Sequence, residues 1–180
     1  MEPDRDAFDY GEGRPGRATA AGRLTVYSIA RGPWEVRLSR VDSLADPTAV
    51  RLRIGGWAVA GPKETTLEPT GVTVTGSGLC SRLVALAGPG VRTGVAEYED
   101  ASPLGHGVRV PWLEYQAEVG RWVCVLVELR GDTAPEPEPR ATAAVEADGG
   151  GRWNVRVLWP DGFTTSTQIN ESGVASPAAP

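Results

Sequence analysis

The only histidine, His106, is the first residue to test for catalysis, because imidazole titrates near neutral pH. Nucleophilic catalysis needs a base within hydrogen-bond reach of a nucleophile and, usually, a third group that orients the base. Asp100 and Ser102 are the nearest candidates, but the segment does not resemble a nucleophile elbow. We therefore expect a loop histidine without a catalytic role. A single histidine also excludes a multi-histidine metal centre.

The acidic side chains give no clearer catalytic site. Glu97, Glu99 and Asp100 cluster in the segment EYED, and paired carboxylates hydrolyse glycosides when they are held at a defined separation across a sugar. Glu97 and Glu99 alternate with Tyr98, however, so in a strand both would share the solvent face. We interpret this cluster as a solvated strand end.

Two cysteines, Cys80 and Cys124, are too few for a zinc site, which needs about four ligands. Both lie in apolar, strand-like runs, which favours small buried side chains. A disulfide between them would require their two strands to be neighbours. The glycine-containing segments 76–81 and 88–94 match neither a Walker loop nor a dinucleotide fingerprint. The sequence therefore predicts neither a metal site nor a cofactor.

Tryptophan is the residue type with the most potential for ligand binding. Exposed indoles on a rigid sheet form stacking surfaces for sugars, whereas buried indoles fill the space between sheets. Trp34 and Trp153 share strand faces with aliphatic residues, which favours core packing for both. Trp57 follows a glycine pair and Trp112 follows Pro111, so these two tryptophans are the candidate ligand-binding residues. The chain has six tryptophans, at positions 34, 57, 112, 122, 153 and 159.

Short strands separated by turn residues would have to position these side chains. Glycine, proline and charge dominate residues 1–22, which we expect to be a poorly ordered lead-in. Residues 23–170 form the β-sandwich domain, and residues 171–180 are expected to be a disordered tail. About ten short strands with turns every 8–12 residues predict an all-β fold, a two-sheet antiparallel β-sandwich with flexible termini.

Residues 121–131 are apolar on both faces of the predicted strand, since three valines alternate with three other apolar residues. A strand buried on both faces is central in its sheet or covered by another layer. The run 112–119 precedes it, and the turn near Val119 and Gly120 predicts a hairpin between the two strands.

The overall charge and hydropathy exclude some classes of partner. The formal net charge is −5, whereas a nucleic-acid binder usually presents a basic face. No apolar run approaches the roughly 20 residues that span a bilayer. The acidic, glycine-rich first residues do not resemble a signal peptide. We therefore expect a one-domain cytoplasmic protein that binds neither nucleic acid nor a membrane.

Two segments carry a resemblance to a known family. Residues 27–42 contain the run Gly-Pro-Trp-Glu-Val-Arg at positions 32–37, and residues 50–61 contain Gly55, Gly56 and Trp57. Together they resemble the C-terminal β-sandwich of the domain of unknown function 2264 family. Those proteins carry an α/α-toroid ahead of the sandwich, as do heparinase II/III-like polysaccharide lyases.

The resemblance implies a non-catalytic accessory β-sandwich, detached from a carbohydrate-active toroid protein, with a helical toroid as its partner. The toroid, where a catalytic cleft would lie, is missing, so no catalytic residue is carried over and no activity of the chain's own is expected. A second hypothesis, based on the number of tryptophans, is a free-standing carbohydrate-binding module for a polysaccharide. A third is a small hydrolase or lyase that uses His106 with a nearby acidic residue.

Overall fold

In the computed structural model the chain folds into strands joined by turns and loops, and the described residues contain no helix. The structure describes residues 23–43, 51–88, 90–98, 107–116, 118–136, 140–170 and 175–177. The all-β class predicted from the sequence is confirmed. The described strands divide among three antiparallel sheets, where the sequence predicted two.

The central sheet has six strands in the order β1-β2-β10-β7-β6-β5. A tight turn at Gly32, which has a positive φ of 56°, joins β1 to β2. The last three strands of this order form an antiparallel meander. The strands are β1 (Arg23–Arg31), β2 (Trp34–Ser43), β10 (Trp122–Gly131), β7 (Leu79–Ala87), β6 (Gly71–Gly76) and β5 (Pro62–Glu68).

The second sheet, here the β9 sheet, is built around one long strand. β3 and β4 pair with successive parts of one edge of β9. β8 pairs over its whole length with the other edge of β9. The strands are β3 (Arg51–Gly55), β4 (Val59–Ala60), β8 (Val91–Tyr98) and β9 (Val108–Gln116).

The third sheet, here the β12 sheet, follows the connection after β10. Its strands are paired in sequence order. Asp161 and Gly162 form the turn between the second and third strands. Gly162 has φ 81°, and Asp161 accepts a hydrogen bond from the amide of Phe163. The strands are β11 (Thr142–Ala147), β12 (Arg152–Leu158), β13 (Thr164–Asn170) and β14 (Ala175–Pro177).

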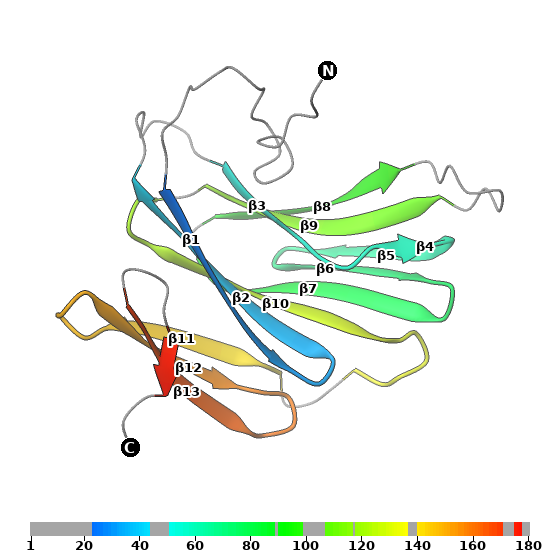
Figure 1. The fold of residues 1–180 in the computed structure, drawn as a ribbon. Coiled ribbons are helices and arrows are strands. Elements are labelled where there is room, and N and C mark those ends of the chain that lie inside the picture. Colours follow the sequence, from blue (N-terminus) through cyan, green and yellow to red (C-terminus); the bar gives the residue numbers. More distant parts are fainter. Residues whose placement is uncertain are drawn as a thin grey trace, which may run out of the picture.

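The two smaller sheets cover opposite faces of the central sheet (Figure 1). One hydrophobic cluster lies between the central sheet and the β12 sheet and includes Leu38, Leu126 and Trp159. The other lies between the central sheet and the β9 sheet and includes Leu83 and Leu113. Side chains of β10 contribute to both clusters. The prediction that residues 121–131 form a strand buried on both faces is therefore confirmed.

The predicted hairpin between residues 112–119 and 121–131 is wrong. β9 pairs with β3, β4 and β8, whereas β10 pairs with β2 and β7. The turn at Gly120 passes from one sheet to another, and its amide donates to the carbonyl of Val41 at the end of β2. The reason is burial: the outward face of β9 includes the polar residues Glu114 and Gln116, whereas β10 is apolar on both faces and belongs in the middle layer.

Two strands lie where the sequence predicted none. β5 is polar and contains Pro62 and Lys63, which is compatible with its place at the sheet edge, where a ladder of hydrogen bonds is needed on one side only. β14 lies within the predicted disordered tail and pairs with the free edge of β13. Residues 1–22, 171–174 and 178–180 lie outside the described part of the chain.

Candidate functional site

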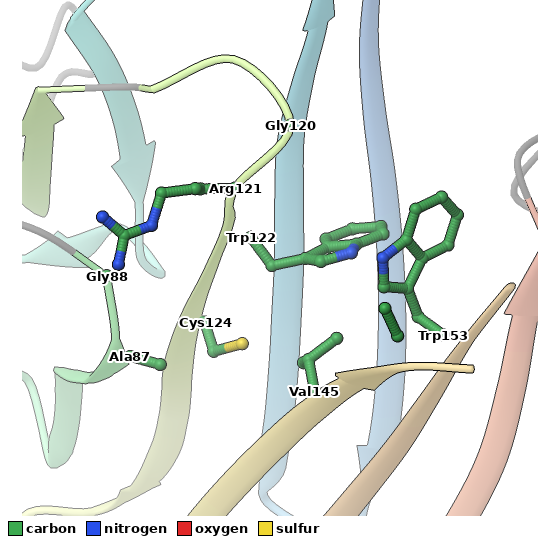
Figure 2. Close-up of a pocket in the computed structure, with 9 residues that line it drawn as sticks. Ala87, Gly88, Gly120, Arg121, Trp122, Cys124, Val145 and Trp153 are labelled. Atoms are coloured by element: carbon green, nitrogen blue, oxygen red, sulfur yellow. The ribbon is translucent and has the colours of Figure 1, made fainter. Parts of the chain in front are cut away.

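A groove opens between the central sheet and the β12 sheet, with a volume of about 330 Å³. Its walls are mostly small or apolar side chains from β7, β10 and β11, and an indole from each sheet lies beside it (Figure 2). The groove is lined by Ala87, Gly88, Gly120, Arg121, Trp122, Cys124, Val145, Ala147 and Trp153.

The two indoles of the groove clamp the sheets together. Trp122 of β10 and Trp153 of β12 meet edge to face, with ring centroids 5.8 Å apart and an interplanar angle of 74°. The guanidinium of Arg40, from β2, lies 3.7 Å from the centroid of Trp153 and 5.0 Å from that of Trp122. Asp42 pairs with Arg40, so its buried charge is compensated. This arrangement accounts for the indoles by packing.

The groove offers little reactivity. Burial raises the pKa of the Cys124 thiol to about 12, so the nucleophilic thiolate is not populated near neutral pH. Arg121 at the rim already pairs with Glu118, at 2.8 Å. Cys80 is also buried, and burial raises the pKa of its thiol.

The two cysteines lie on neighbouring strands but far apart. Cys80 of β7 is opposite Arg130, and Cys124 of β10 is opposite Ala87. Six residues of extended strand separate Cys124 from Arg130, which corresponds to about 20 Å. Both thiols are free, and no disulfide joins them.

A buried network of charges joins β2, β10 and β7 of the central sheet to the segment after β10. Glu128 is 1 % exposed and accepts a hydrogen bond of 3.3 Å from the indole of Trp34. Arg130 lies 3.4 Å from the same carboxylate. Arg82, opposite Glu128 on β7, pairs at 2.7 Å with Glu136 of the segment after β10. The network contains two arginines and two glutamates, so its charges balance. We interpret the network as an anchor for the segment after β10.

Trp57, the first candidate from the sequence, is 45 % exposed. The guanidinium of Arg37 lies 5.9 Å from its ring centroid and donates to the carbonyl of Gly55 at 2.6 Å. Glu35 accepts two hydrogen bonds from Arg37 and a third from Ser28. The hydrogen bonds from Arg37 hold the pKa of Glu35 below its usual value. This network fixes the end of β3 against β2.

The glycine pair before Trp57 has a packing reason. A side chain at Gly56 would meet Leu83 at 2.0 Å and Pro111 at 3.0 Å. The Gly56 amide donates to the carbonyl of Pro111, which ends the pairing of β3 with β9. The chain therefore turns close against the core before Trp57, as the glycine pair indicated.

Trp112, the second candidate, is half-buried on the outward face of the β9 sheet. Leu113 and Tyr115 of the same strand point inward to the core, so Trp112 and Glu114 point outward. The indole lies across Gly94, its neighbour on β8: a Cβ there would be 2.2 Å from the ring. The guanidinium carbon of Arg53, on the other neighbouring strand, is 4.5 Å from the ring centroid.

Arginines surround Trp112 on this face. Arg53 and Arg92 are both directly opposite Glu114, on β3 and β8. Arg53 pairs with Glu114 at 2.8 Å, and Arg51 lies 3.8 Å from it. We call Arg51, Arg53, Arg92, Trp112 and Glu114 the Arg–Trp face.

Four other residues considered in the sequence analysis lie outside the described part of the chain: His106, Glu99, Asp100 and Ser102. Glu97 pairs with Arg109, at 2.8 Å. The ring contact among the described residues joins Trp122 to Trp153 and does not involve Trp57 or Trp112.

The described residues contain no group of three or more His, Cys, Asp or Glu side chains arranged to hold a metal ion. Within the same ranges, no helix has the length and apolar character needed to cross a membrane. A scan against protein-family models, a search of curated proteins and a search of solved structures each found no match.

Proposed function

We propose that this chain is a non-catalytic accessory β domain that binds a polysaccharide on the Arg–Trp face. The observation that carries the proposal is the placement of Trp112. Gly94 leaves room for the indole to lie across β8, and the guanidinium of Arg53 lies over the ring, 4.5 Å from its centroid. A flat indole bordered by fixed N–H donors suits a sugar, which has apolar ring faces and hydroxyl acceptors around its rim.

Trp57 extends the same end of this sheet. It is two residues beyond Gly55, and Gly55 is directly opposite Trp112. The two candidate tryptophans therefore start from neighbouring positions, one half-buried and one 45 % exposed. The ring of Trp57 lies near Arg37 of the central sheet, so Trp57 lies beside the Arg–Trp face and is not part of it.

The accessory part of the proposal includes a helical toroid as partner. The two segments that resemble the toroid-plus-sandwich family meet in the structure, because Arg37 of the first segment donates to Gly55 of the second and lies over Trp57. Co-expression with a toroid protein from the same genome, followed by size-exclusion chromatography, tests the partnership. Elution of the two proteins as separate monomers would refute it.

Isothermal titration calorimetry against a panel of acidic and neutral polysaccharides tests glycan binding. We expect Trp112→Ala to weaken binding about 10-fold, because the indole and the support that it gives to the guanidinium of Arg53 are removed. Phe163→Ala is the matched control, since Phe163 is an exposed aromatic residue in the turn between β12 and β13. Thermal melting checks that each variant is folded, and Arg53→Gln replaces Trp112→Ala if that variant unfolds. No heat with any glycan would reject the proposed function.

A further inference from the structure

We infer that the ligand of the Arg–Trp face is an anionic polysaccharide, one with carboxylate or sulfate groups on its sugars. This inference rests on the proposed function and adds the chemical class of the ligand. It depends on the charges of the face, which Trp112 alone does not determine.

The Arg–Trp face has a local charge opposite to that of the whole chain. Three arginines surround one carboxylate, that of Glu114, so the face carries a formal charge of +2, whereas the whole chain carries −5. Glu114 is only 7 % exposed. The positive groups are therefore what an approaching ligand meets.

The guanidinium groups of this face are accessible. The side chains of Arg51 and Arg53 are 67 % and 53 % exposed, and Arg92 is exposed as well. Arg92 has no ion-pair partner among the described residues. Its donors are free for a carboxylate or sulfate, which guanidinium binds through two parallel hydrogen bonds.

The spacing of the arginines fits a polymer better than a single anion. Arg53 and Arg92 lie on the strands to either side of β9, so their backbones are separated by about 10 Å, two strand spacings. Arg51 lies a further two residues along β3. Anionic groups on successive sugars of one chain could meet successive arginines.

The face suits a glycan better than a nucleic acid. Proteins that bind single strands stack bases on freely accessible aromatic rings along a basic groove. The Arg–Trp face contains one half-buried indole, and this indole makes no ring contact with another described aromatic residue, so the face offers no row of rings for successive bases. The described charges also form a small patch on an acidic chain instead of a basic stripe.

Polygalacturonate and its fully methyl-esterified form are the matched probes, because they share a backbone and differ in charge. Calorimetry with the full chain should show binding to polygalacturonate that weakens as salt is raised, and weaker binding to the ester. Arg92→Gln should reduce the affinity for polygalacturonate roughly 3- to 10-fold. Because Arg92 makes no ion pair with another described residue, this substitution should leave the melting temperature unchanged.

The matched control is Arg156→Gln. Arg156 is an exposed arginine on β12 with no ion pair among the described residues, and its loss should leave binding unchanged. Equal binding of polygalacturonate and its ester, or unchanged affinity in Arg92→Gln, would overturn the anionic inference and leave glycan binding intact. No binding to either probe or to the neutral glycans would overturn both proposals. Tighter binding of single-stranded oligothymidylate than of polygalacturonate would replace the glycan with a nucleic acid.

Discussion

Gly94 is required by its neighbour on the next strand. The indole of Trp112 occupies the space where any other side chain would begin, 2.2 Å from the position of a Cβ. Glycine destabilises a strand because it loses more backbone entropy on folding than other residues and has no side chain to pack. An aromatic ring that lies across the glycine restores some of the missing apolar contact. The same contact fixes the orientation of the ring on the sheet surface.

Gly94→Val should therefore displace Trp112 without unfolding the chain. The new side chain would clash with the ring, but β8 is an edge strand, and valine itself favours strands. We expect the tryptophan emission to shift to the red and glycan binding to fall as in Trp112→Ala. An unchanged emission spectrum together with unchanged binding would show that the ring does not lie across Gly94.

Glu35 provides a pH-dependent contact at the residue scale. Hydrogen bonds from Arg37 lower its pKa in the folded state from an ordinary value near 4.5. Its contribution to stability is then present above that ordinary pKa and is lost as the pH falls through the lower folded value. Because the pair is partly exposed, we expect a contribution of about 0.5 kcal/mol.

Glu35→Gln tests that contact by urea denaturation at two pH values. At pH 7 the variant should be less stable than the parent protein by this small amount. As the pH is lowered through the folded-state pKa of Glu35, the difference should shrink. A difference of the same size at both pH values would show that the carboxylate charge is not what stabilises the end of β3.

At the scale of elements, alternation of apolar and polar residues predicted most strands. In residues 33–42 and 49–61 apolar residues alternate with polar ones, and the apolar residues Val36, Leu38, Leu52 and Ile54 are buried as this pattern indicates. β5 was missed because its residues are polar and include Pro62, which an edge strand tolerates. The partition into three sheets could not be predicted, because alternation shows which face is buried but not which strand is its neighbour.

The candidate site was predictable to a similar extent. The glycine pair before Trp57 correctly indicated a side chain exposed beyond a sharp bend. In the sequence, Arg51 and Arg53 alternate with Leu52 and Ile54, which is the pattern of a strand with both arginines on its outward face. The contacts of Trp112 with Gly94 and Arg53 depend on the register of three strands, and register is set by packing between residues far apart in sequence.

At the same scale, the contact of Arg40 with Trp122 and Trp153 joins the central sheet to the β12 sheet. We expect Arg40→Met to cost about 2 kcal/mol of unfolding free energy, since it removes the cation from two indoles and leaves Asp42 without its nearest cation. Urea denaturation measures the change. Arg40→Met combined with Asp42→Asn should recover part of the loss, because the carboxylate charge is no longer uncompensated. A fully additive double variant would contradict the coupling.

At the scale of the whole molecule, β10 links the two hydrophobic clusters into one cooperative unit. Leu38 belongs to the cluster facing the β12 sheet, and Leu83 belongs to the cluster facing the β9 sheet. Both side chains are completely buried. Because β10 contributes to both clusters, loss of either is expected to affect the whole fold.

Leu38→Ala and Leu83→Ala should each cost about 2–5 kcal/mol, as expected for large-to-small changes in a packed core. Urea denaturation followed by tryptophan fluorescence and by circular dichroism should give one coincident transition for each variant. Two separated transitions, or a variant that loses one sheet while the other persists, would show that the layers unfold independently.

The central position of β10 also determines the order in which the chain can fold. The β1–β2 hairpin and the β5–β6–β7 meander of the central sheet have no direct pairing, and β10 is the strand that lies between them. A chain synthesised only to residue 121 therefore has both parts of the central sheet but lacks the strand that joins them. We expect folding to be completed late and to take on the order of milliseconds to seconds, as is typical of β proteins dominated by long-range pairing.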